Sequence, residues 1–477
     1  MRCWRPFSVV LALLSGTTVH SHESLPADEA EGARSLHEAR DWRPCGNRAT
    51  PLDTTPGAVA LEPGELVHGD RVLLFTADDG GGALDLWKSS GTQGAGTSLV
   101  KDFSPELADL SPLELTRVGT RVFFTAEDSE HGRELWVSDG TPGGTRLVKD
   151  LWPGPLGSFP QSLFEFDGLL YFSAGDEEHG HELWRSDGTP QGTFLVEDLE
   201  PGPEGSSVQG LTRGSGGALY FLIDRSGFFR VLMRSDGGAG ATEVFRVPST
   251  NVLESLTPVG QRLFFITGDS HEPMTELMVT AGGPPVRLGM FAEVYELVAM
   301  GGRLYFSAST QEDPAGLELW RSDGTPGGTR RVKDVRPGSE GSSPQGLTVL
   351  GRRLFFSADD GLHGRELWVS DGTASGTQLF SDLSPGTLGS SPEELTAIQD
   401  HLFFSADTAG RGRTPWVSDG TPRGTVSIEG PAAGAQASNP REFVRSGWDV
   451  FFTAEDGARG RRLWALPFRP TGRCQGE

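Results

Sequence analysis

The sequence has few cysteines, fewer basic than acidic residues, and no long apolar run after its first residues. Only 3 of its 477 residues are cysteine. No later stretch approaches the roughly 20 apolar residues that a membrane-spanning helix requires, so membrane insertion is not expected. The 65 acidic residues outnumber the 41 basic ones, which gives a formal net charge of −24. This charge disfavours binding of DNA, RNA or an anionic membrane through bulk electrostatics, and it favours solubility.

Sequence patterns of common catalytic sites are also missing. The chain has no G-x-S-x-G nucleophile elbow, no H-E-x-x-H metal motif, no phosphate-binding G-x-x-x-x-G-K-[ST] loop and no C-x-x-C pair. We therefore assign no catalytic residue, no cofactor-binding residue and no metal ligand. On this basis the chain is interpreted as not being an enzyme.

The first residues have the layout of a secretory signal peptide. Arg2 and Arg5 precede an apolar run from Phe7 to Leu14, which small and polar residues follow. Residues 19–21 (VHS) fit a small-x-small cleavage site. We predict a signal peptide over residues 1–21 and a secreted, periplasmic or cell-surface protein.

What the sequence does contain is one unit repeated nine times. Each unit has an apolar segment such as VFFTA or LFFSA, followed about a dozen residues later by a pattern such as ELWVSDGT. The position of the tryptophan recurs every 42 to 49 residues. Periods of this length, with several short strands in each unit, are typical of β-propellers. The nine positions are Trp87, Trp136, Trp184, Met233, Met278, Trp320, Trp368, Trp416 and Trp464.

The second unit shows the blade that we expect. Its strands, named A to D in chain order, are predicted at residues 113–118, 121–126, 134–138 and 146–150. Short loops join A to B, B to C and C to D, and a longer D–A loop leads to the next unit. This pattern predicts a four-stranded antiparallel blade.

The recurring tryptophan and aspartate are interpreted as parts of this blade. A large flat side chain suits packing between neighbouring blades, and the alternative is a site that stacks a ligand. The aspartate of D-G-T can accept hydrogen bonds from backbone N–H groups two residues on, and the glycine permits a positive φ. The residues given these structural roles are Trp87, Trp136, Trp184, Trp320, Trp368, Trp416, Trp464, Asp139, Asp187, Asp323 and Asp371.

The last unit, from Glu442 to Phe468, supplies only three strands. An open edge of a propeller would invite aggregation, so the ring needs a closing strand. We expect the segment around residues 47–54 to add the outer strand of the last blade. The predicted organisation is a signal peptide at 1–21, an extension with the ring-closing strand at 22–57, an all-β propeller at 58–468 and a tail at 469–477. Nine blades are favoured, and eight is the alternative if one degenerate unit forms none.

The cysteines support the same closure. Cys3 lies in the predicted signal peptide, while Cys45 and Cys474 flank the repeats. Such a pair in an exported chain predicts a disulfide, and two free thiols are the alternative. In the chain-entropy model the bridge would contribute on the order of 4–5 kcal/mol.

The complete motif stands at residues 134–141, 182–189, 318–325 and 366–373. At these residues the chain resembles the ELWxxDGT-repeat proteins, which occur mostly as exported or surface-associated bacterial proteins. The resemblance covers nearly all of the mature chain and is weakest in the fifth unit. It implies a propeller-like fold and export, and it implies no catalytic assignment.

Acidic residues occupy the B–C loop in most units. Calcium binds clustered carboxylates, yet none of these loops has the spaced D-x-D-x-D-G pattern with a distal glutamate. Acids of hairpin turns are therefore the favoured interpretation, calcium binding is the alternative, and no other cofactor is expected. The residues are Asp78, Asp79, Glu127, Asp128, Asp176, Glu177, Asp359, Asp360, Glu455 and Asp456.

Histidines recur at one position of the same loop, at His131, His179 and His363, and His181 replaces an arginine nearby. One histidine per blade does not converge on a single metal ion, so a role in the loop is favoured. Residues that break the repeat gather in the fourth and fifth units and are interpreted as repeat decay, with a site as the alternative. They are Arg225, Phe228, Phe229, Arg230, His271, Glu272 and Glu276.

The favoured function is a secreted interaction module that binds an unidentified protein or glycan as a monomer. Because B–C and D–A loops share one face of a propeller, we place the ligand surface there. The alternative is a polysaccharide-acting hydrolase or lyase with an axial site. Two or more carboxylates or histidines that converge near the axis would favour that alternative.

Overall fold

The computed structural model describes residues 42–52, 62–69, 71–78, 83–94, 96–103, 112–269, 274–311, 316–408, 412–431, 436–457 and 460–474. The predicted signal peptide lies outside the described residues, as do Asp79, His271 and Glu272. Within these ranges no helix is long and apolar enough to cross a membrane.

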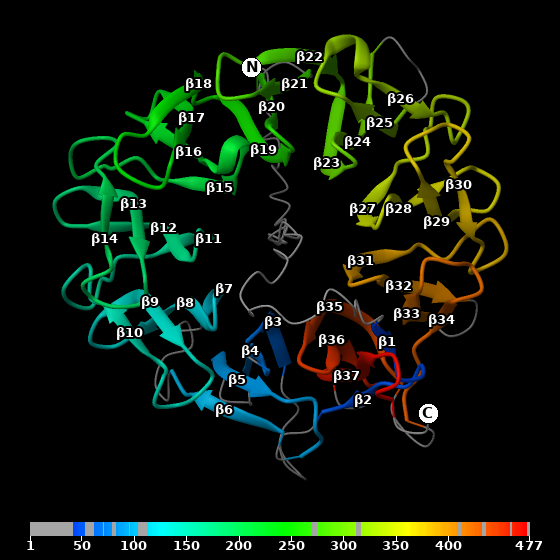
Figure 1. The fold of residues 1–477 in the computed structure, drawn as a ribbon, viewed down its shortest axis with the longest axis horizontal. Helices are drawn as coiled ribbons and strands as arrows, with labels where there is room; N and C mark the ends of the chain where they lie inside the picture. The colour runs from blue at the N-terminus through cyan, green and yellow to red at the C-terminus, as the bar shows by residue number, and fades with distance from the viewer. Residues whose placement is uncertain are drawn as a thin grey trace, which may run out of the picture. The chain divides into compact units, whose positions relative to one another are not determined.

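The nine sequence units form nine antiparallel sheets in a ring, which confirms the predicted nine-bladed propeller (Figure 1). The eight-bladed alternative is wrong, because the drifted fourth and fifth units keep all four strands. In each blade strand A is innermost and the later strands follow outward. Each strand A lies beside strand A of both neighbouring blades, and the last of them contacts the first.

Blades one to five have these strands, from inside outward: β3 (Glu62–His68), β4 (Leu73–Asp78), β5 (Asp85–Ser89), β6 (Thr97–Lys101); β7 (Leu113–Val118), β8 (Arg121–Asp128), β9 (Gly132–Ser138), β10 (Arg146–Lys149); β11 (Gln161–Phe166), β12 (Leu169–Asp176), β13 (Gly180–Ser186), β14 (Phe194–Glu197); β15 (Gln209–Arg213), β16 (Leu219–Arg225), β17 (Phe229–Ser235), β18 (Thr242–Pro248); β19 (Asn251–Val259), β20 (Arg262–Asp269), β21 (Thr275–Thr280), β22 (Val286–Phe291).

Blades six to nine follow the same order: β23 (Glu293–Met300), β24 (Arg303–Ser309), β25 (Glu318–Ser322), β26 (Arg330–Lys333); β27 (Gln345–Leu350), β28 (Arg353–Asp359), β29 (Arg365–Ser370), β30 (Gln378–Ser381); β31 (Glu393–Ile398), β32 (His401–Thr408), β33 (Gly412–Ser418), β34 (Thr425–Ser427); β35 (Ser438–Ser446), β36 (Asp449–Glu455), β37 (Arg461–Pro470). Two short 3-10 turns, η1 (Ser215–Gly217) and η2 (Pro326–Gly328), complete the described elements.

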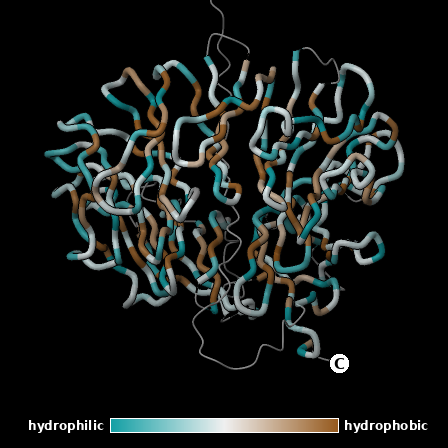
Figure 2. The backbone as a smooth tube through the Cα atoms, turned by 45° about the horizontal axis from the view of Figure 1, so that its top comes forward, coloured by the Kyte–Doolittle hydropathy of each residue, from teal (hydrophilic) through white to brown (hydrophobic). Residues whose placement is uncertain are grey.

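The core lies between neighbouring blades. Strand B is apolar throughout because both of its faces are covered, and residues 122–126 of β8 are all buried. Each hydrophobic cluster joins two blades: Phe124 and Trp136 of blade two pack with Leu74 and Leu86 of blade one. Figure 2 shows the same division, with hydrophobic residues along the strands and hydrophilic residues in many of the loops. Burial on both faces explains why the apolar segments lack the alternation of a half-exposed strand.

The recurring tryptophans lie in these contacts between blades. Trp136 and Trp184 are each 6% exposed, and Trp184 packs in a cluster with Val137 and Leu151 of the preceding blade. The ammonium group of Lys149, also from that blade, lies 5.8 Å from the centroid of the Trp184 ring. The indole N–H groups of six tryptophans are buried without an acceptor in the described part of the chain; they belong to Trp87, Trp136, Trp184, Trp320, Trp368 and Trp416.

The D-G-T segment forms a turn that satisfies its own polar groups. Oδ1 of Asp371 accepts from the backbone N–H of Thr373 at 2.8 Å and from its hydroxyl at 2.7 Å. The hydroxyl of Thr373 accepts from the N–H of Gly376 at 3.0 Å. The same turn stands at Asp139, Asp187, Asp323 and Asp419. Gly372 has a φ of 86°, and a Cβ there would overlap the hydroxyl of Tyr305 in the preceding blade, so glycine is required.

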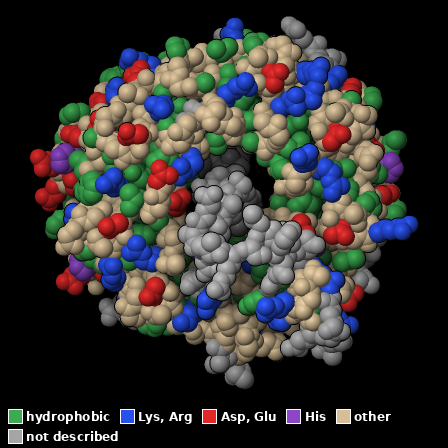
Figure 3. Space-filling view, in the orientation of Figure 1, with side chains coloured by type: hydrophobic (Ala, Val, Ile, Leu, Met, Phe, Trp, Pro, Cys, Tyr) green, Lys and Arg blue, Asp and Glu red, His purple; other side chains and the backbone are tan. Residues whose placement is uncertain are grey.

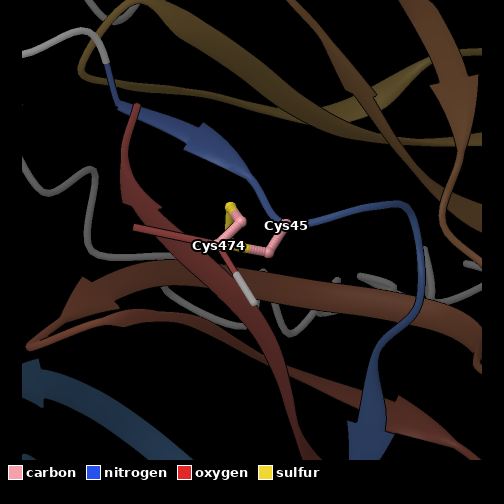
Figure 4. Close-up of a disulfide and its surroundings, with 2 residues drawn as sticks. All are labelled: Cys45 and Cys474. Carbon is pink, nitrogen blue, oxygen red and sulfur yellow. A yellow bond between two sulfur atoms is a disulfide. The ribbon is translucent and has the colours of Figure 1, made fainter. Parts of the chain in front are cut away.

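The N-terminal segment closes the ring, as predicted, but it begins earlier than expected. Strand β1 (Trp42–Pro44) and strand β2 (Thr50–Pro51) both pair antiparallel with β37 of blade nine. The expected segment at residues 47–54 therefore contributes only β2. The predicted disulfide joins Cys45, between the two closing strands, to Cys474 (Figure 4). The bond links the segment that closes the ring to the residues that follow β37.

Candidate functional site

The B–C and D–A loops lie together on one face of the ring. The start of strand C forms a parallel bridge with the D–A loop of the same unit at four places: Arg133–Gly157, His181–Gly205, Leu317–Gly341 and Arg365–Gly389. We call this side the pocket face, because the polar pocket described below opens there. The A–B turns and C–D loops lie at the other ends of the same strands.

The glutamate of E-L-W holds the D–A loop in place. Glu134 is fully buried. Its carboxylate accepts from the N–H of Trp152 at 3.1 Å, and from the N–H and the hydroxyl of Ser158 at 2.9 and 2.6 Å. Burial raises the pKa of Glu134 to about 7, although these hydrogen bonds act in the opposite direction. The pairs Glu182–Ser206, Glu318–Ser342 and Glu366–Ser390 repeat the contact. The repeated glutamates therefore support the pocket face from beneath.

The repeated histidines do not converge. Nδ1 of His131 lies 3.0 Å from the carboxylate of Asp128 in the same loop, and this hydrogen bond raises the pKa of His131. His179–Asp176 and His363–Asp360 are equivalent pairs in blades three and seven. Figure 3 shows histidine side chains at the outer edge of the ring, on opposite sides of the view. These positions are consistent with loop residues rather than with ligands of one centre.

Acids of the B–C loops are largely occupied within their own blades. Asp128 accepts from the backbone N–H of Glu130 and of His131. Asp359 forms an ion pair of 2.7 Å with Arg336, and Asp456 pairs with Arg462. Among the residues that the structure describes, no three His, Cys, Asp or Glu side chains could hold one metal ion. The described B–C loops therefore give no support to the alternative of calcium binding.

The residues that break the repeat in blades four and five form separate ion pairs. Arg225 bonds Glu200 and Glu243, each at 3.3 Å. Arg230 lies 3.1 Å from Asp224. Glu276 lies 2.8 Å from Arg287, and Phe228 is 72% exposed. Those of the predicted residues that the structure describes contact separate partners and do not meet in a shared site.

Sequence analysis missed a set of glutamates on the innermost strands. Every strand A contains a β-bulge, and four blades place a glutamate there with φ between 53° and 57°. A non-glycine residue in this left-handed region is strained by about 1–2 kcal/mol, which makes the position a candidate for function. Aligning the units shows serine, glycine or glutamate at this position, which is the only signal in the sequence. The four residues are Glu114, Glu296, Glu394 and Glu442.

Carboxylates of one blade bond the bulge of the next. Glu65 accepts from the N–H of Glu114 at 3.1 Å and from that of Leu115 at 2.8 Å. Glu394 accepts from the N–H of Glu442 at 3.5 Å. These contacts satisfy amides that a bulge leaves unpaired. They also bring acids of blades eight, nine, one and two together on the inner side of the ring.

Glu442 differs from the other bulge glutamates. Its carboxylate accepts no hydrogen bond from the described residues. The surrounding ring reduces its solvation, and the charges of Glu394 and Glu65 add to this, so that the pKa of Glu442 rises to about 7. Its side chain is nevertheless exposed by surface area, so solvent screens part of this effect. Glu442 is therefore an acid that can exchange a proton near neutral pH.

A polar pocket of about 330 Å³ lies beside these acids, between blades eight and nine. Arg413 lies in its wall and donates hydrogen bonds to Ser405 at 3.0 Å and to Glu393 at 3.2 Å. The amide of Asn439 donates to Glu455 at 3.1 Å. The pocket is lined by Glu393, Glu394, Ser405, Arg413, Asn439, Pro440, Arg441 and Glu455.

Arg441 is the exposed cation of this pocket. Within the described chain its guanidinium group forms no hydrogen bond or ion pair, whereas that of Arg413 is held by its neighbours. The pocket thus presents one guanidinium group that is not held by the described residues, beside several carboxylates. It occurs where the repeat is altered: blade eight has Thr414 and Pro415 in place of the Glu-Leu of the motif.

Comparison with known proteins gives similarity of fold alone. No family model and no curated protein matches the chain. A solved prolyl endopeptidase is 14% identical, with 73% of this chain and 55% of that chain covered and a TM-score of 0.41. A puromycin-hydrolyzing peptidase of Mycobacterium tuberculosis is 13% identical (72% and 58% covered, TM-score 0.39), and another puromycin hydrolase is 15% identical (72% and 58%, TM-score 0.38). The chain spans just over half the length of these enzymes.

One conclusion from the sequence needs correction. The chain was interpreted as not being an enzyme, because its repeats and its missing motifs suggested scaffold alone. That exclusion is wrong, because an absence of motifs shows nothing about activity, and the solved structures matched above are of enzymes, at TM-scores that assign no role to this chain. A repeated fold with no recognisable nucleophile motif does not exclude catalysis. At 13–15% identity the similarity assigns no peptidase activity to this chain.

Proposed function

We propose that the chain is an exported binding propeller of the ELWxxDGT-repeat type, and that it holds a partner in the pocket between blades eight and nine. The Cys45–Cys474 disulfide supports export, because such bonds persist in oxidising compartments. The observation that carries the binding proposal is the polar pocket beside Glu394, with the unpaired guanidinium of Arg441 at its wall. Concave sites with a few convergent polar groups are the usual places for ligands.

The lining favours a charged peptide segment over a sugar. None of the lining residues is aromatic, so a sugar ring would have no flat surface for stacking. Acids and the unpaired Arg441 occur together in the pocket, which suits a ligand with both a cationic and an anionic group. A lysine or arginine next to an aspartate or glutamate in a partner protein has this chemistry. The ligand cation would face Glu394, and its carboxylate would pair with Arg441.

A displayed peptide library selected against the purified chain tests this proposal. We expect enrichment of peptides with adjacent basic and acidic residues. Titration calorimetry should then show about 10-fold weaker binding for Arg441→Ala, because a hydrogen bond to a charged group contributes about 1.5–3 kcal/mol. Arg423→Ala is the matched control, because Arg423 is an exposed arginine in the C–D loop of blade eight. Equal losses in both variants, or no enrichment, would contradict the proposal.

One observation favours a second candidate, a hydrolase acting on a polymer at the same place. Glu442, with a pKa of about 7, stands on the bulge next to Glu394, and a proton donor near neutral pH beside ionised carboxylates is an arrangement that hydrolases use. A panel of polysaccharides and peptides would be assayed for cleavage. Activity that Glu442→Gln abolishes, and whose rate falls above pH 7, would favour this candidate. The absence of cleavage in the whole panel would argue against it.

A further inference from the structure

The seam where the ring closes gathers basic and aromatic side chains at the ends of the strands opposite the pocket face. Gly447, in the A–B turn of blade nine, lies beside the backbone of Arg71 in the turn of blade one. Arg445 and Trp448 flank that glycine, and the closing strand adds Trp42. With Arg473 from the C-terminal end, these residues form what we call the seam patch: Trp42, Arg71, Arg445, Trp448 and Arg473.

Four side chains of the seam patch are stacked on one another, and Arg71 lies beside them through its backbone contact with Gly447. The guanidinium carbon of Arg445 lies 3.7 Å from the centroid of the Trp42 ring. The rings of Trp42 and Trp448 are 5.8 Å apart, and the guanidinium carbon of Arg473 lies 5.9 Å from the Trp448 ring. Trp448 is 46% exposed, and Arg71 and Arg473 are also exposed. A preformed surface of indole and guanidinium groups therefore faces solvent.

Among the described residues, the positive charge of this surface is not balanced by neighbouring carboxylates. In the described part of the chain, no carboxylate forms an ion pair with Arg71, Arg445 or Arg473. The Nε–H group of Arg445 is buried without an acceptor. The adjacent acid, Asp449, is directed toward Gly91 of blade one, and burial raises its pKa to about 6. A concentration of unpaired cations is unexpected on a chain with a formal charge of −24.

We propose that the seam patch binds an acidic polysaccharide. Guanidinium groups pair with carboxylates and sulfates through two parallel hydrogen bonds, which an isolated ammonium cannot match. The exposed indole of Trp448 offers a flat apolar surface against which the C–H face of a sugar ring can lie. Cations spread over two blades and the chain end suit an extended polymer with repeated negative charges. The rest of the acidic surface repels polyanions, so binding is confined to the seam.

This inference goes beyond the proposed peptide pocket, because the seam patch shares no residue with the pocket and lies at the opposite ends of the strands. A propeller that holds an acidic glycan on one side and a protein on the other would link the two. If the expected ligand does not bind at one of the two sites, the proposal for the other site is not affected. The two proposals are therefore tested separately.

Binding of polygalacturonate to the purified chain, with its disulfide intact, tests the inference. We expect binding that weakens at least 10-fold in the double variant Arg71→Gln/Arg473→Gln and about 5-fold in Trp448→Ser. Neutral dextran should not bind. The matched control is Arg352→Gln, which removes an exposed arginine from the equivalent A–B turn of blade seven and should leave binding unchanged. Circular dichroism would verify that each variant is folded.

Three results would overturn the proposal. The first is no binding of polygalacturonate by the unmodified chain. The second is an equal loss in Arg352→Gln, which would show a general effect of charge. The third is binding of duplex DNA, or of phosphatidylglycerol vesicles, as tight as that of polygalacturonate, since this would show a surface selective for charge alone and not for a glycan.

Discussion

The hydroxyl of Ser158 donates a hydrogen bond of 2.6 Å to Oε2 of Glu134, although the two residues are 24 positions apart. This contact ties the third strand of blade two to the loop that leads to blade three. It recurs with the same length in blades three, six and seven. The glutamate of the repeat and the serine of the loop therefore act as one unit, and they give the pocket face a rigid base.

Removing either partner should destabilise the propeller. Glu366→Ala leaves two partly buried backbone N–H groups and the buried hydroxyl of Ser390 without an acceptor, which should cost on the order of 3 kcal/mol. Ser390→Ala removes a single hydrogen bond and should cost about 1 kcal/mol. Urea unfolding would measure both. Ser375→Ala, at an exposed loop position of the same blade, should stay within about 0.5 kcal/mol of the unmodified chain. If Ser390→Ala behaves like that control, the contact does not stabilise the fold.

The same glutamates should make the stability depend on pH. Burial raises the pKa of Glu134 and of Glu182 to about 7, from the 4.5 of an unperturbed glutamate. Between these values the folded chain binds more protons than the unfolded chain. The free energy of unfolding must therefore fall as the pH rises from 4.5 through 7, by up to about 3 kcal/mol for each group. Urea unfolding at pH 5, 6, 7 and 8 would measure this decrease.

A variant with both groups removed isolates this effect. Glu134→Gln/Glu182→Gln cannot ionise at these positions, so the decrease between pH 5 and 8 should shrink by the contribution of the two residues. A slope that does not change in the double variant would mean that other groups cause the pH dependence.

Much of the fold could be predicted because short segments of the sequence determine its strands and turns, and these segments are repeated. The strand-B segments are apolar in all nine units, and the D-G-T turns satisfy their own hydrogen bonds within a few residues, as Asp371 does. Ring closure was also predictable, since a three-stranded last unit and Cys45 with Cys474 indicate the same place. The start of the closing segment at Trp42 was not predictable, because a strand of three partly buried residues carries no periodic pattern.

The candidate sites could not be predicted, because the contacts that create them are distant in sequence. A buried glutamate is unusual, and nothing near Glu134 shows that Ser158 will satisfy it. Nothing in the sequence distinguishes Glu442 from other glutamates, because Glu394 comes near it only through the β-bulges of the folded chain. The seam patch combines residues from both ends of the chain, which only closure of the ring brings together. Sequence patterns thus determined the scaffold, while tertiary contacts determine where charges accumulate.

The tryptophans should differ in how they tolerate phenylalanine. The indole N–H of Trp464 donates to the carbonyl of Ala454 at 3.1 Å, whereas that of Trp136 has no acceptor in the described chain. Trp136→Phe removes packing alone. Trp464→Phe also breaks a buried hydrogen bond, so it should cost about 1 kcal/mol more. Urea unfolding of both variants would show the difference, and equal costs would mean that this hydrogen bond adds nothing to stability.

Loss of the disulfide should open the ring at one blade. Cys45 and Cys474 are separated by 429 positions, so the bond strongly restricts the unfolded chain. Cys45→Ser/Cys474→Ser should lower the free energy of unfolding by roughly 2–5 kcal/mol. The pairs that β1 and β2 form with β37 would then be held by hydrogen bonds and by the packing of Trp42, Ala49 and Leu52.

Hydrogen exchange measured by mass spectrometry would locate the opening. We expect faster exchange in β1, β2 and β37, with β28 of blade seven as the internal reference, because only the seam loses its covalent link. The unmodified chain treated with a reductant should behave like the double variant. Uniformly faster exchange in all blades would show instead that the disulfide stabilises the propeller as a whole, and that the seam is not its weakest point.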